Sequence, residues 1–292
     1  MRRFFLLGIL LLTACTQEIA NSPQLPMVTS AFMTATDTAT PPPTPVPATV
    51  TPITFPAPAP LPPGPVSIIT IGDSLTQGDG DESGRGYPGR LLELVNQIRP
   101  GTTITNFGLS GWTSDALING DQGYFGQLMR AADESRSALA GDRSAVVLVW
   151  VGSNDLWYLY EYGGDVTPAQ EAEDAARFEA NIETILSELR TTGAQVIIAL
   201  LDDQSQRPVA LRGEAFTAIT PDELAMMSEQ VKRYNAIIQS QAAQYGALTV
   251  DFYNSDIFII PATLADDGNH PNAAGYDLVT QAWYKALITI LP

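Results

Sequence analysis

V-S-I-I-T-I-G-D-S-L-T-Q-G, residues 66–78, joins a short apolar run to a glycine, an aspartate and a serine. Positions 66–71 are mostly β-branched, which is typical of a strand buried on both faces of a parallel sheet. The run ends at Gly72-Asp73-Ser74, so a hydroxyl is presented at the carboxyl end of a strand, where open α/β sheets bind ligands. Ser74 needs a base to act as a nucleophile, and His270 is the one histidine of the chain.

Composition restricts the chemistry of this chain. A formal net charge of −17 over 292 residues argues against nucleic acid as a partner and against a polybasic membrane-binding patch. One cysteine excludes an internal disulfide framework and a thiolate metal cluster, and one histidine excludes metal motifs that need two. We therefore expect no cofactor and no metal, and a site built from Ser, Asp, Glu, Asn, Lys and one imidazole.

The amino terminus has the features of a targeting segment. Met1-Arg2-Arg3 is positively charged, and residues 4–12 form an apolar core too short to span a bilayer. Leu12-Thr13-Ala14-Cys15 resembles the bacterial lipobox, which predicts a signal peptide over 1–14 and lipidation of Cys15. An ordinary secretory signal that contains a cysteine is the alternative. The resemblance implies an extracytoplasmic lipoprotein on the bacterial cell surface, held at the membrane through its N-terminal anchor only.

Residues 15–65 are rich in Thr, Pro and Ala, and twelve of the residues from 41 to 65 are proline. Such a segment buries too little apolar surface to offset its ordering entropy, so we predict a disordered, semi-rigid stalk. Glycosylation of its threonines and recognition by a proline-binding module are further readings of this composition. Residues 66–292 are predicted to form one folded domain, which we expect to be a monomer.

The pattern after residue 66 alternates apolar runs with amphipathic segments, and it predicts strands followed by helices. Thr167-Pro168 and Thr220-Pro221 each place a capping residue before a proline at the first helical position. This alternation predicts right-handed crossovers and an α/β fold, a three-layer α/β/α sandwich around a central five-stranded parallel sheet. The strands are expected at 66–71, 103–108, 145–151, 194–201 and 247–252, and the helices at 87–98, 123–139, 168–191, 221–245 and 272–290.

Four polar blocks lie at the carboxyl ends of predicted strands or in the loops that leave them. Because parallel strands end at one rim of a sheet, the fold is expected to bring these blocks together. They are Gly72-Asp73-Ser74-Leu75, Asn106-Phe107-Gly108-Leu109-Ser110-Gly111, Gly152-Ser153-Asn154-Asp155 and Asp267-Gly268-Asn269-His270-Pro271-Asn272-Ala273-Ala274-Gly275.

The four blocks contain what ester hydrolysis requires. Ser74 is the candidate nucleophile and His270 is the candidate base, since imidazole titrates near neutral pH. Asp267, three residues before His270, is placed to fix the tautomer of the ring. The backbone N–H groups of Ser74 and Gly111 and the side-chain amide of Asn154 are candidate donors for an oxyanion hole.

These blocks, in this order, resemble the SGNH or GDSL hydrolase family. The family's Ser, Gly, Asn, Asp and His fall on Ser74, Gly111, Asn154, Asp267 and His270. The resemblance covers residues 66–292 and implies a flavodoxin-like fold and hydrolysis of carboxylic esters. It does not fix the substrate, because family members hydrolyse lysophospholipids, thioesters, short-chain esters and acetyl groups on polysaccharides.

Several residues have a structural reading beside the functional one. Ser74 can cap the turn after the first strand, and Asp266 is a rival for the carboxylate that orients the ring. Asp73 is either a capping carboxylate or a substrate contact. Trp157 and Tyr158 either stack on a sugar or line an acyl pocket, or they pack a long loop onto the domain. Whether 202–220 forms a lid is left open.

The sequence as a whole predicts a surface-anchored serine esterase that forms an acyl-enzyme. The long stalk favours short acyl groups, such as acetyl on a polysaccharide, as the substrate. The lipid anchor motivates the alternative of a lysophospholipase or short-chain lipase. A non-catalytic surface binding module on the same fold is the alternative from another class.

Overall fold

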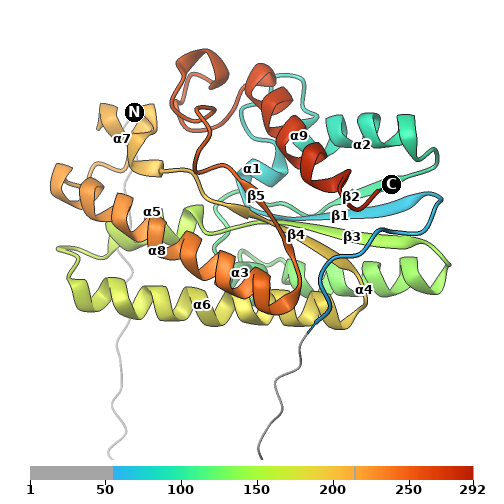
Figure 1. The fold of residues 1–292 in the computed structure, drawn as a ribbon. Helices are drawn as coiled ribbons and strands as arrows, with labels where there is room; N and C mark the ends of the chain where they lie inside the picture. Colours follow the sequence, from blue (N-terminus) through green and yellow to red (C-terminus); the bar gives the residue numbers. More distant parts are fainter. Residues whose placement is uncertain (1–54, 214, 292) are drawn as a thin grey trace, which may run out of the picture. The chain divides into compact units, whose positions relative to one another are not determined.

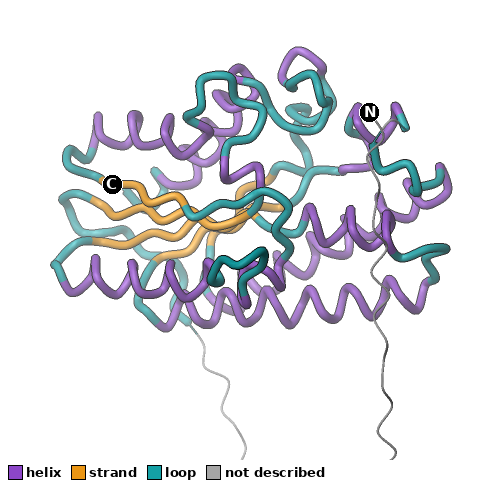
Figure 2. The backbone as a smooth tube through the Cα atoms, turned by 180° about the vertical axis from the view of Figure 1, so that it is seen from behind, coloured by secondary structure: helices purple, strands orange, loops and turns teal. Residues whose placement is uncertain are grey.

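The computed structural model describes residues 55–213 and 215–291. The predicted signal peptide, Cys15 and the stalk up to residue 54 lie outside the described residues. Inside them, a parallel sheet lies between two layers of helices, as the views from the front (Figure 1) and from behind (Figure 2) show. No helix of this described part is both long and apolar enough to cross a bilayer.

The sheet has five strands in the order β2-β1-β3-β4-β5, and all pairs are parallel. This is the flavodoxin-like doubly wound order, so the predicted fold class is confirmed. β1 pairs with β3 from Val66↔Ser144 to Gly72↔Trp150 and is fully buried, which explains its continuous apolar sequence. The strands are β1 (Val66–Gly72), β2 (Thr103–Asn106), β3 (Ser144–Trp150), β4 (Gln195–Leu200) and β5 (Leu248–Asp251).

Helices α2 and α9 cover one face of the sheet, and α4, α6 and α8 cover the other (Figure 1). Thr167 and Thr220 each form a capping box at the start of their helix, as the sequence predicts. The helices are α1 (Ser74–Gln77), α2 (Gly86–Ile98), α3 (Ser114–Asn119), α4 (Gln127–Ala140), α5 (Ser153–Tyr162), α6 (Pro168–Thr191), α7 (Pro208–Arg212), α8 (Pro221–Tyr245) and α9 (Ala273–Leu287).

The predicted helix bounds differ from the observed ones in two regions. The aromatic segment 157–162, read from the sequence as part of a long loop, belongs to α5, whose buried face includes Leu156, Trp157 and Tyr160. Helix α4 begins at Gln127 and not at 123, because the preceding residues form a turn closed by the Asp121↔Tyr124 bridge. Short helices α1, α3 and α7 were not predicted, since each is too brief to show a periodic pattern.

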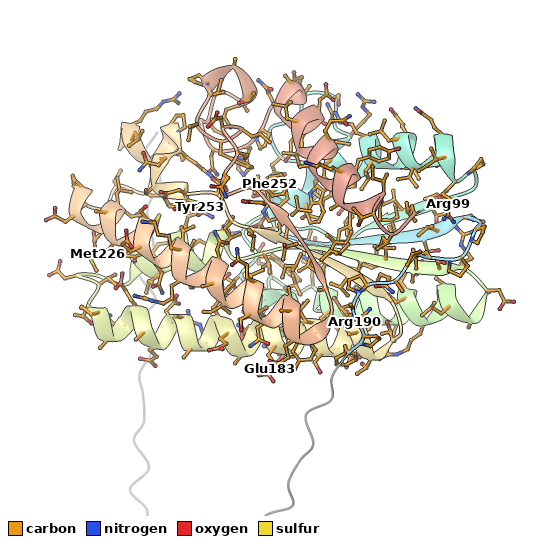
Figure 3. All side chains as sticks on the ribbon, in the orientation of Figure 1. Arg99, Glu183, Arg190, Met226, Phe252 and Tyr253 are labelled. Atoms are coloured by element: carbon orange, nitrogen blue, oxygen red, sulfur yellow. The ribbon has the colours of Figure 1, made fainter. Side chains whose placement is uncertain are left out.

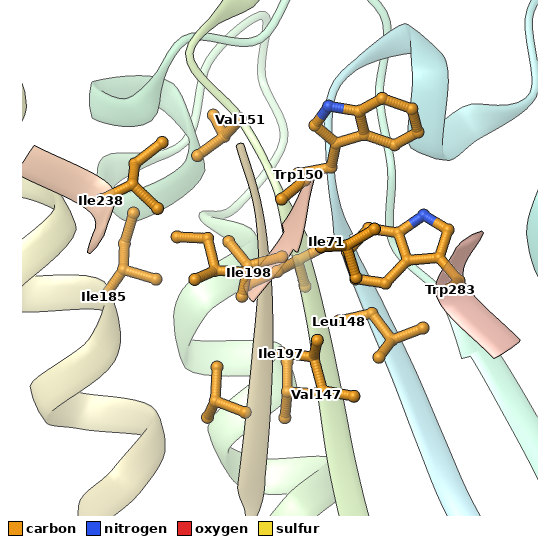
Figure 4. Close-up of a cluster of buried hydrophobic side chains, with 14 of the residues drawn as sticks. Ile71, Val147, Leu148, Trp150, Val151, Ile185, Ile197, Ile198, Ile238 and Trp283 are labelled. Carbon is orange, nitrogen blue, oxygen red and sulfur yellow. The ribbon is translucent and has the colours of Figure 1, made fainter. Parts of the chain in front are cut away.

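The core lies on both faces of the sheet. On the α9 side, Trp150 of β3 stacks on Phe252 with ring centroids 4.3 Å apart and meets Trp283 of α9 edge-on at 6.0 Å. Ile185 of α6 and Ile238 of α8 are fully buried on the opposite side (Figure 4). The strand ends that carry the polar blocks therefore project from a rigid, close-packed layer.

Residues 55–65 contact the domain, although the sequence assigned them to the disordered stalk. Phe55 and Leu61 are half-buried against the core, and the Leu61 N–H donates to a backbone carbonyl near the C-terminus at 2.8 Å. Prolines offer no N–H, but their carbonyls accept hydrogen bonds from Arg190 (3.2 Å) and Arg99 (2.6 Å), both labelled in Figure 3. The physical boundary of the domain therefore lies before residue 66.

Phe55→Ala is expected to lower the free energy of unfolding by about 1–2 kcal/mol. The change removes a ring that contacts Tyr245 at 5.4 Å and lies below the guanidinium of Arg190. Urea denaturation measures the effect. Phe125→Ala is the matched control, because that ring is 87% exposed, and its effect is expected to stay within about 0.5 kcal/mol. Equal effects of the two substitutions would contradict the revised boundary.

Candidate active site

Ser74, His270 and Asp267 form a continuous chain of hydrogen bonds at the carboxyl end of the sheet. Ser74 Oγ lies 3.0 Å from His270 Nε2, and His270 Nδ1 lies 2.6 Å from Asp267 Oδ2. With Nδ1–H donating to the carboxylate, Nε2 is free to accept the serine proton. The sequence prediction that these three residues meet agrees with these distances, and Asp267 rather than Asp266 contacts the ring.

The turn that exposes Ser74 depends on Gly72. This glycine has φ +153°, and a Cβ at its position would lie 2.1 Å from the Trp150 carbonyl oxygen, so only glycine fits. Gln127 of α4, which the sequence did not single out, is fully buried and pairs with both backbone groups of Gly72, accepting at 2.7 Å and donating at 2.8 Å. The nucleophile is therefore fixed from beneath by the helix layer.

Asp73 is fully buried and caps α1 by accepting from the Leu75 N–H at 3.0 Å. The predicted substrate contact at this position is wrong, because the side chain does not reach the surface. Its Oδ2 has no hydrogen-bond partner among the described residues. Burial raises the pKa of Asp73 to about 7, against the lowering effects of the Leu75 N–H, Arg207 and His270.

The loop that carries His270 is closed on itself. The Ala265 N–H donates to the His270 carbonyl at 2.8 Å, and Leu264 and Pro271 form an antiparallel bridge. Burial alone would raise the pKa of Asp267, but hydrogen bonds from the His270 ring and from the backbone N–H groups of His270 and Asn269 hold it well below its usual range. The carboxylate of Asp267 is therefore ionised and able to accept a hydrogen bond from His270 Nδ1.

The segment 202–213 supports this loop from the side. Arg207 is buried, pairs with Asp202 at 2.6 Å, and donates from Nη1 to the Asn269 side chain at 2.8 Å. The Val209 N–H donates to the Gly268 carbonyl at 3.0 Å. The sequence carries no signal for the role of Arg207, because only the folded chain brings it next to the residue before His270. This part of 202–220 therefore supports the histidine loop through hydrogen bonds to Gly268 and Asn269.

The candidate oxyanion donors come from three elements. The N–H groups of Ser74 and Gly111 donate to no other described residue, and Gly111 has φ +78°, which favours glycine. Asn154 Nδ2 donates one hydrogen to the Trp112 carbonyl at 3.0 Å, which leaves its second hydrogen available. The role of these three groups stays a prediction.

The aromatic side chains after Asn154 do not form the predicted sugar platform. Trp157 is 2% exposed and stacks on Phe216 with centroids 4.2 Å apart, so it packs inside the domain. Tyr158 Oη donates to the Gly111 carbonyl at 3.1 Å. The predicted substrate contact of Trp157 is thus wrong, and the hydroxyl of Tyr158 is already engaged by the protein.

A cavity of about 390 Å³ opens beside His270. Its wall combines side chains of α7 and the following turn, which are apolar apart from Arg212, with polar side chains of the histidine loop. The lining residues are Val209, Arg212, Ala215, Phe216, Asp266, Asp267, Asn269 and His270. No group of three or more His, Cys, Asp or Glu side chains in the described ranges is placed to hold a metal ion.

The model of the GDSL-like lipase/acylhydrolase family matches residues 70–278. An uncharacterised protein of Bacillus subtilis (strain 168), YpmR, is 27% identical over 76% of this chain and 81% of its own. An acetylxylan esterase from Geobacillus stearothermophilus has a similar fold (TM-score 0.53, 21% identity, 77% of this chain and 95% of that one). The psychrotrophic esterase EstA from Pseudoalteromonas sp. also has a similar fold, with a TM-score of 0.52, 17% identity, and coverage of 76% of this chain and 97% of that one.

Asp73→Asn is expected to stabilise the protein at alkaline pH. The pKa of Asp73 is about 7 in the folded protein, and its ordinary value is 3.8. Between these two pH values the unfolded chain has released the proton and the folded protein still holds it. The free energy of unfolding of the wild type therefore falls as the pH rises from about 4 to about 7. The variant should gain about 1.4 kcal/mol per pH unit between roughly pH 4 and pH 7, and keep the difference above it.

Urea denaturation at pH 4 and pH 8 measures the effect of Asp73→Asn. Asp165→Asn, at an exposed position, is the control and should show no such pH-dependent gain. An Asp73→Asn protein less stable than the wild type at pH 8 would refute the assignment of a buried, protonated carboxyl.

Proposed function

The chain belongs to the GDSL-like lipase/acylhydrolase family, and on that basis we propose that it is a serine ester hydrolase that works through an acyl-enzyme. The observation that carries the proposal is the unbroken hydrogen-bond chain from Ser74 through His270 to Asp267, with distances of 3.0 Å and 2.6 Å. No cofactor takes part in this mechanism.

In the first half of the reaction, Ser74 Oγ attacks the carbonyl carbon of the ester and His270 Nε2 takes the hydroxyl proton. The tetrahedral intermediate collapses as the same nitrogen returns the proton to the leaving alkoxide. A water molecule then enters, His270 removes its proton, and hydroxide attack releases the carboxylic acid and restores Ser74. Asp267 remains ionised throughout and stabilises the imidazolium that forms in each half.

The carbonyl oxygen becomes negative in both tetrahedral intermediates. The Ser74 N–H, the Gly111 N–H and the free hydrogen of the Asn154 amide are the proposed donors to this oxygen. Losing one such donor typically costs about 10²–10³ in kcat. The N–H groups of Ser74 and Gly111 support this part of the proposal, because they donate to no other described residue and are therefore available to a substrate oxygen.

We propose short acyl groups, such as acetyl on a carbohydrate, as the substrate class. Five of the eight side chains around the cavity beside His270 are polar or charged, whereas a long acyl chain requires a continuous apolar wall. The fold similarity to an acetylxylan esterase is consistent with this choice. The alternative of a lysophospholipase or short-chain lipase rests on the predicted lipid anchor.

Anchoring at the cell surface through lipidated Cys15 remains part of the proposal. Its support is the lipobox-like sequence before Cys15 and the proline-rich segment that follows. Such an arrangement would hold a catalytic monomer away from the membrane, within reach of polymeric substrates.

Ser74→Ala is expected to lower kcat for p-nitrophenyl acetate by at least ~10³-fold, because no other group supplies the nucleophile. The fold should be retained, as judged by thermal unfolding. Ser240→Ala, at an exposed position of α8, is the matched control and should keep full activity. A fluorophosphonate probe should label the wild type and the control but not Ser74→Ala; turnover retained in Ser74→Ala would end the proposal.

Release of acetate from acetylated xylo-oligosaccharide is expected to exceed release of fatty acid from lysophosphatidylcholine at least tenfold in kcat/KM, because charged side chains interrupt the cavity wall. Titration of the released acid measures both, with Ser74→Ala as the blank. A preference for lysophosphatidylcholine would favour the lipase alternative. Absence of both activities together with absence of probe labelling would favour a binding module.

A further inference from the structure

Helix α5 holds the segment 111–114 at three successive points. Tyr158 Oη donates to the Gly111 carbonyl at 3.1 Å, and Asn154 Nδ2 donates to the Trp112 carbonyl at 3.0 Å. Asp155 accepts from the Ser114 N–H at 2.8 Å and from its Oγ at 2.5 Å. The first and last contacts come from residues that the proposed mechanism does not use.

Gly111 is thereby restrained on both sides. On its amino side, the Ser110 N–H donates to the Gln77 side chain at 2.6 Å. On its carboxyl side, its own carbonyl is held by Tyr158, whose Oη would lie 3.1 Å from a Cβ at position 111. Glycine has the widest choice of backbone conformations, so the direction of its N–H depends on these two hydrogen bonds.

Asp155 provides the deepest of the three contacts. It is 5% exposed, and both of its carboxylate oxygens are used by Ser114. Asn181 of α6 also donates to Ser114 Oγ, at 2.9 Å. Burial raises the pKa of Asp155 to about 6, although the hydrogen bonds from Ser114 favour the charged form. Hydrogen bonds therefore connect the start of α3 to both α5 and α6.

We propose that Tyr158 and Asp155 are positioning residues that set the direction of the Gly111 N–H in the oxyanion hole. This inference rests on the proposed function and extends it, because it assigns the geometry of one donor to two side chains that do not touch the substrate. An oxyanion donor acts only when its hydrogen lies about 2.7–3.1 Å from the developing charge. A small rotation at Gly111 reduces that stabilisation without changing the binding of the uncharged ester.

Tyr158→Phe tests the upper contact, since it removes only the hydroxyl. With p-nitrophenyl acetate, kcat is expected to fall about tenfold, which corresponds to one lost hydrogen bond, while KM stays within about twofold. The acid limb of the pH–rate profile should not move, because the substitution leaves His270 and its partners untouched. Tyr162→Phe is the matched control: it lies on the same helix, is 75% exposed and should retain wild-type kcat.

Asp155→Ala tests the lower contact, because it removes both carboxylate oxygens that accept from Ser114. A fall of about tenfold in kcat at constant KM is again expected, whereas Ser114→Ala, which keeps the backbone hydrogen bond, should lose less than about threefold. Thermal unfolding of each variant identifies any general loss of structure. The Tyr158 result decides the proposal if Asp155→Ala does not fold.

Asn154→Ala and Ser74→Ala separate the failure of this inference from failure of the proposed function. If both lose activity and Tyr158→Phe keeps wild-type kcat, the positioning role is overturned and the esterase remains. Equal losses in Tyr158→Phe and Tyr162→Phe, or a change confined to KM, would also overturn it. If Ser74→Ala retains turnover, the proposed function itself fails.

Discussion

The proposed mechanism depends on one hydrogen bond of 3.0 Å, between Ser74 Oγ and His270 Nε2. The two residues are 196 positions apart in the sequence, so the rest of the fold has to hold them at this distance. A displacement of about 1 Å at a reacting group is enough to cost 10²-fold in rate. The parallel sheet meets the first part of this demand, since the buried strand β1 fixes the turn at Gly72 relative to its neighbours. The histidine loop follows no strand directly and needs other restraints.

Those restraints come from both sides of the loop. Helix α9 begins directly after it, and Tyr276 Oη donates to the carbonyls of Leu75 at 3.3 Å and Asp79 at 2.9 Å, which flank the turn after Ser74. On the other side, the buried pair of Asp202 and Arg207 directs one nitrogen to Asn269. Such a pair adds little net stability after desolvation, so its value lies in the position it gives to that nitrogen.

The sequence was sufficient for the features that local patterns encode. The buried strands read as apolar runs, the caps at Thr167 and Thr220 read as Thr-Pro, and the motif blocks led to Ser74 and His270. It was insufficient where a residue's role depends on a partner far along the chain. Gln127 pairs with Gly72 across 55 positions and Arg207 reaches Asn269 across 62; neither leaves a periodic or compositional signal.

Exposure separates the two halves of the site, and this follows from the chemistry each half performs. The half that moves a proton is partly open, with the side chain of His270 18% exposed and that of Asp267 46% exposed, since imidazole must exchange protons with serine, alcohol and water in turn. The half that meets a developing charge gains from donors that do not reorganise. In that half, segment 111–114 is hydrogen-bonded to one helix, α5, through Asn154, Asp155 and Tyr158. Solvent therefore reaches the half of the site where protons travel, and buried contacts hold the half where negative charge accumulates.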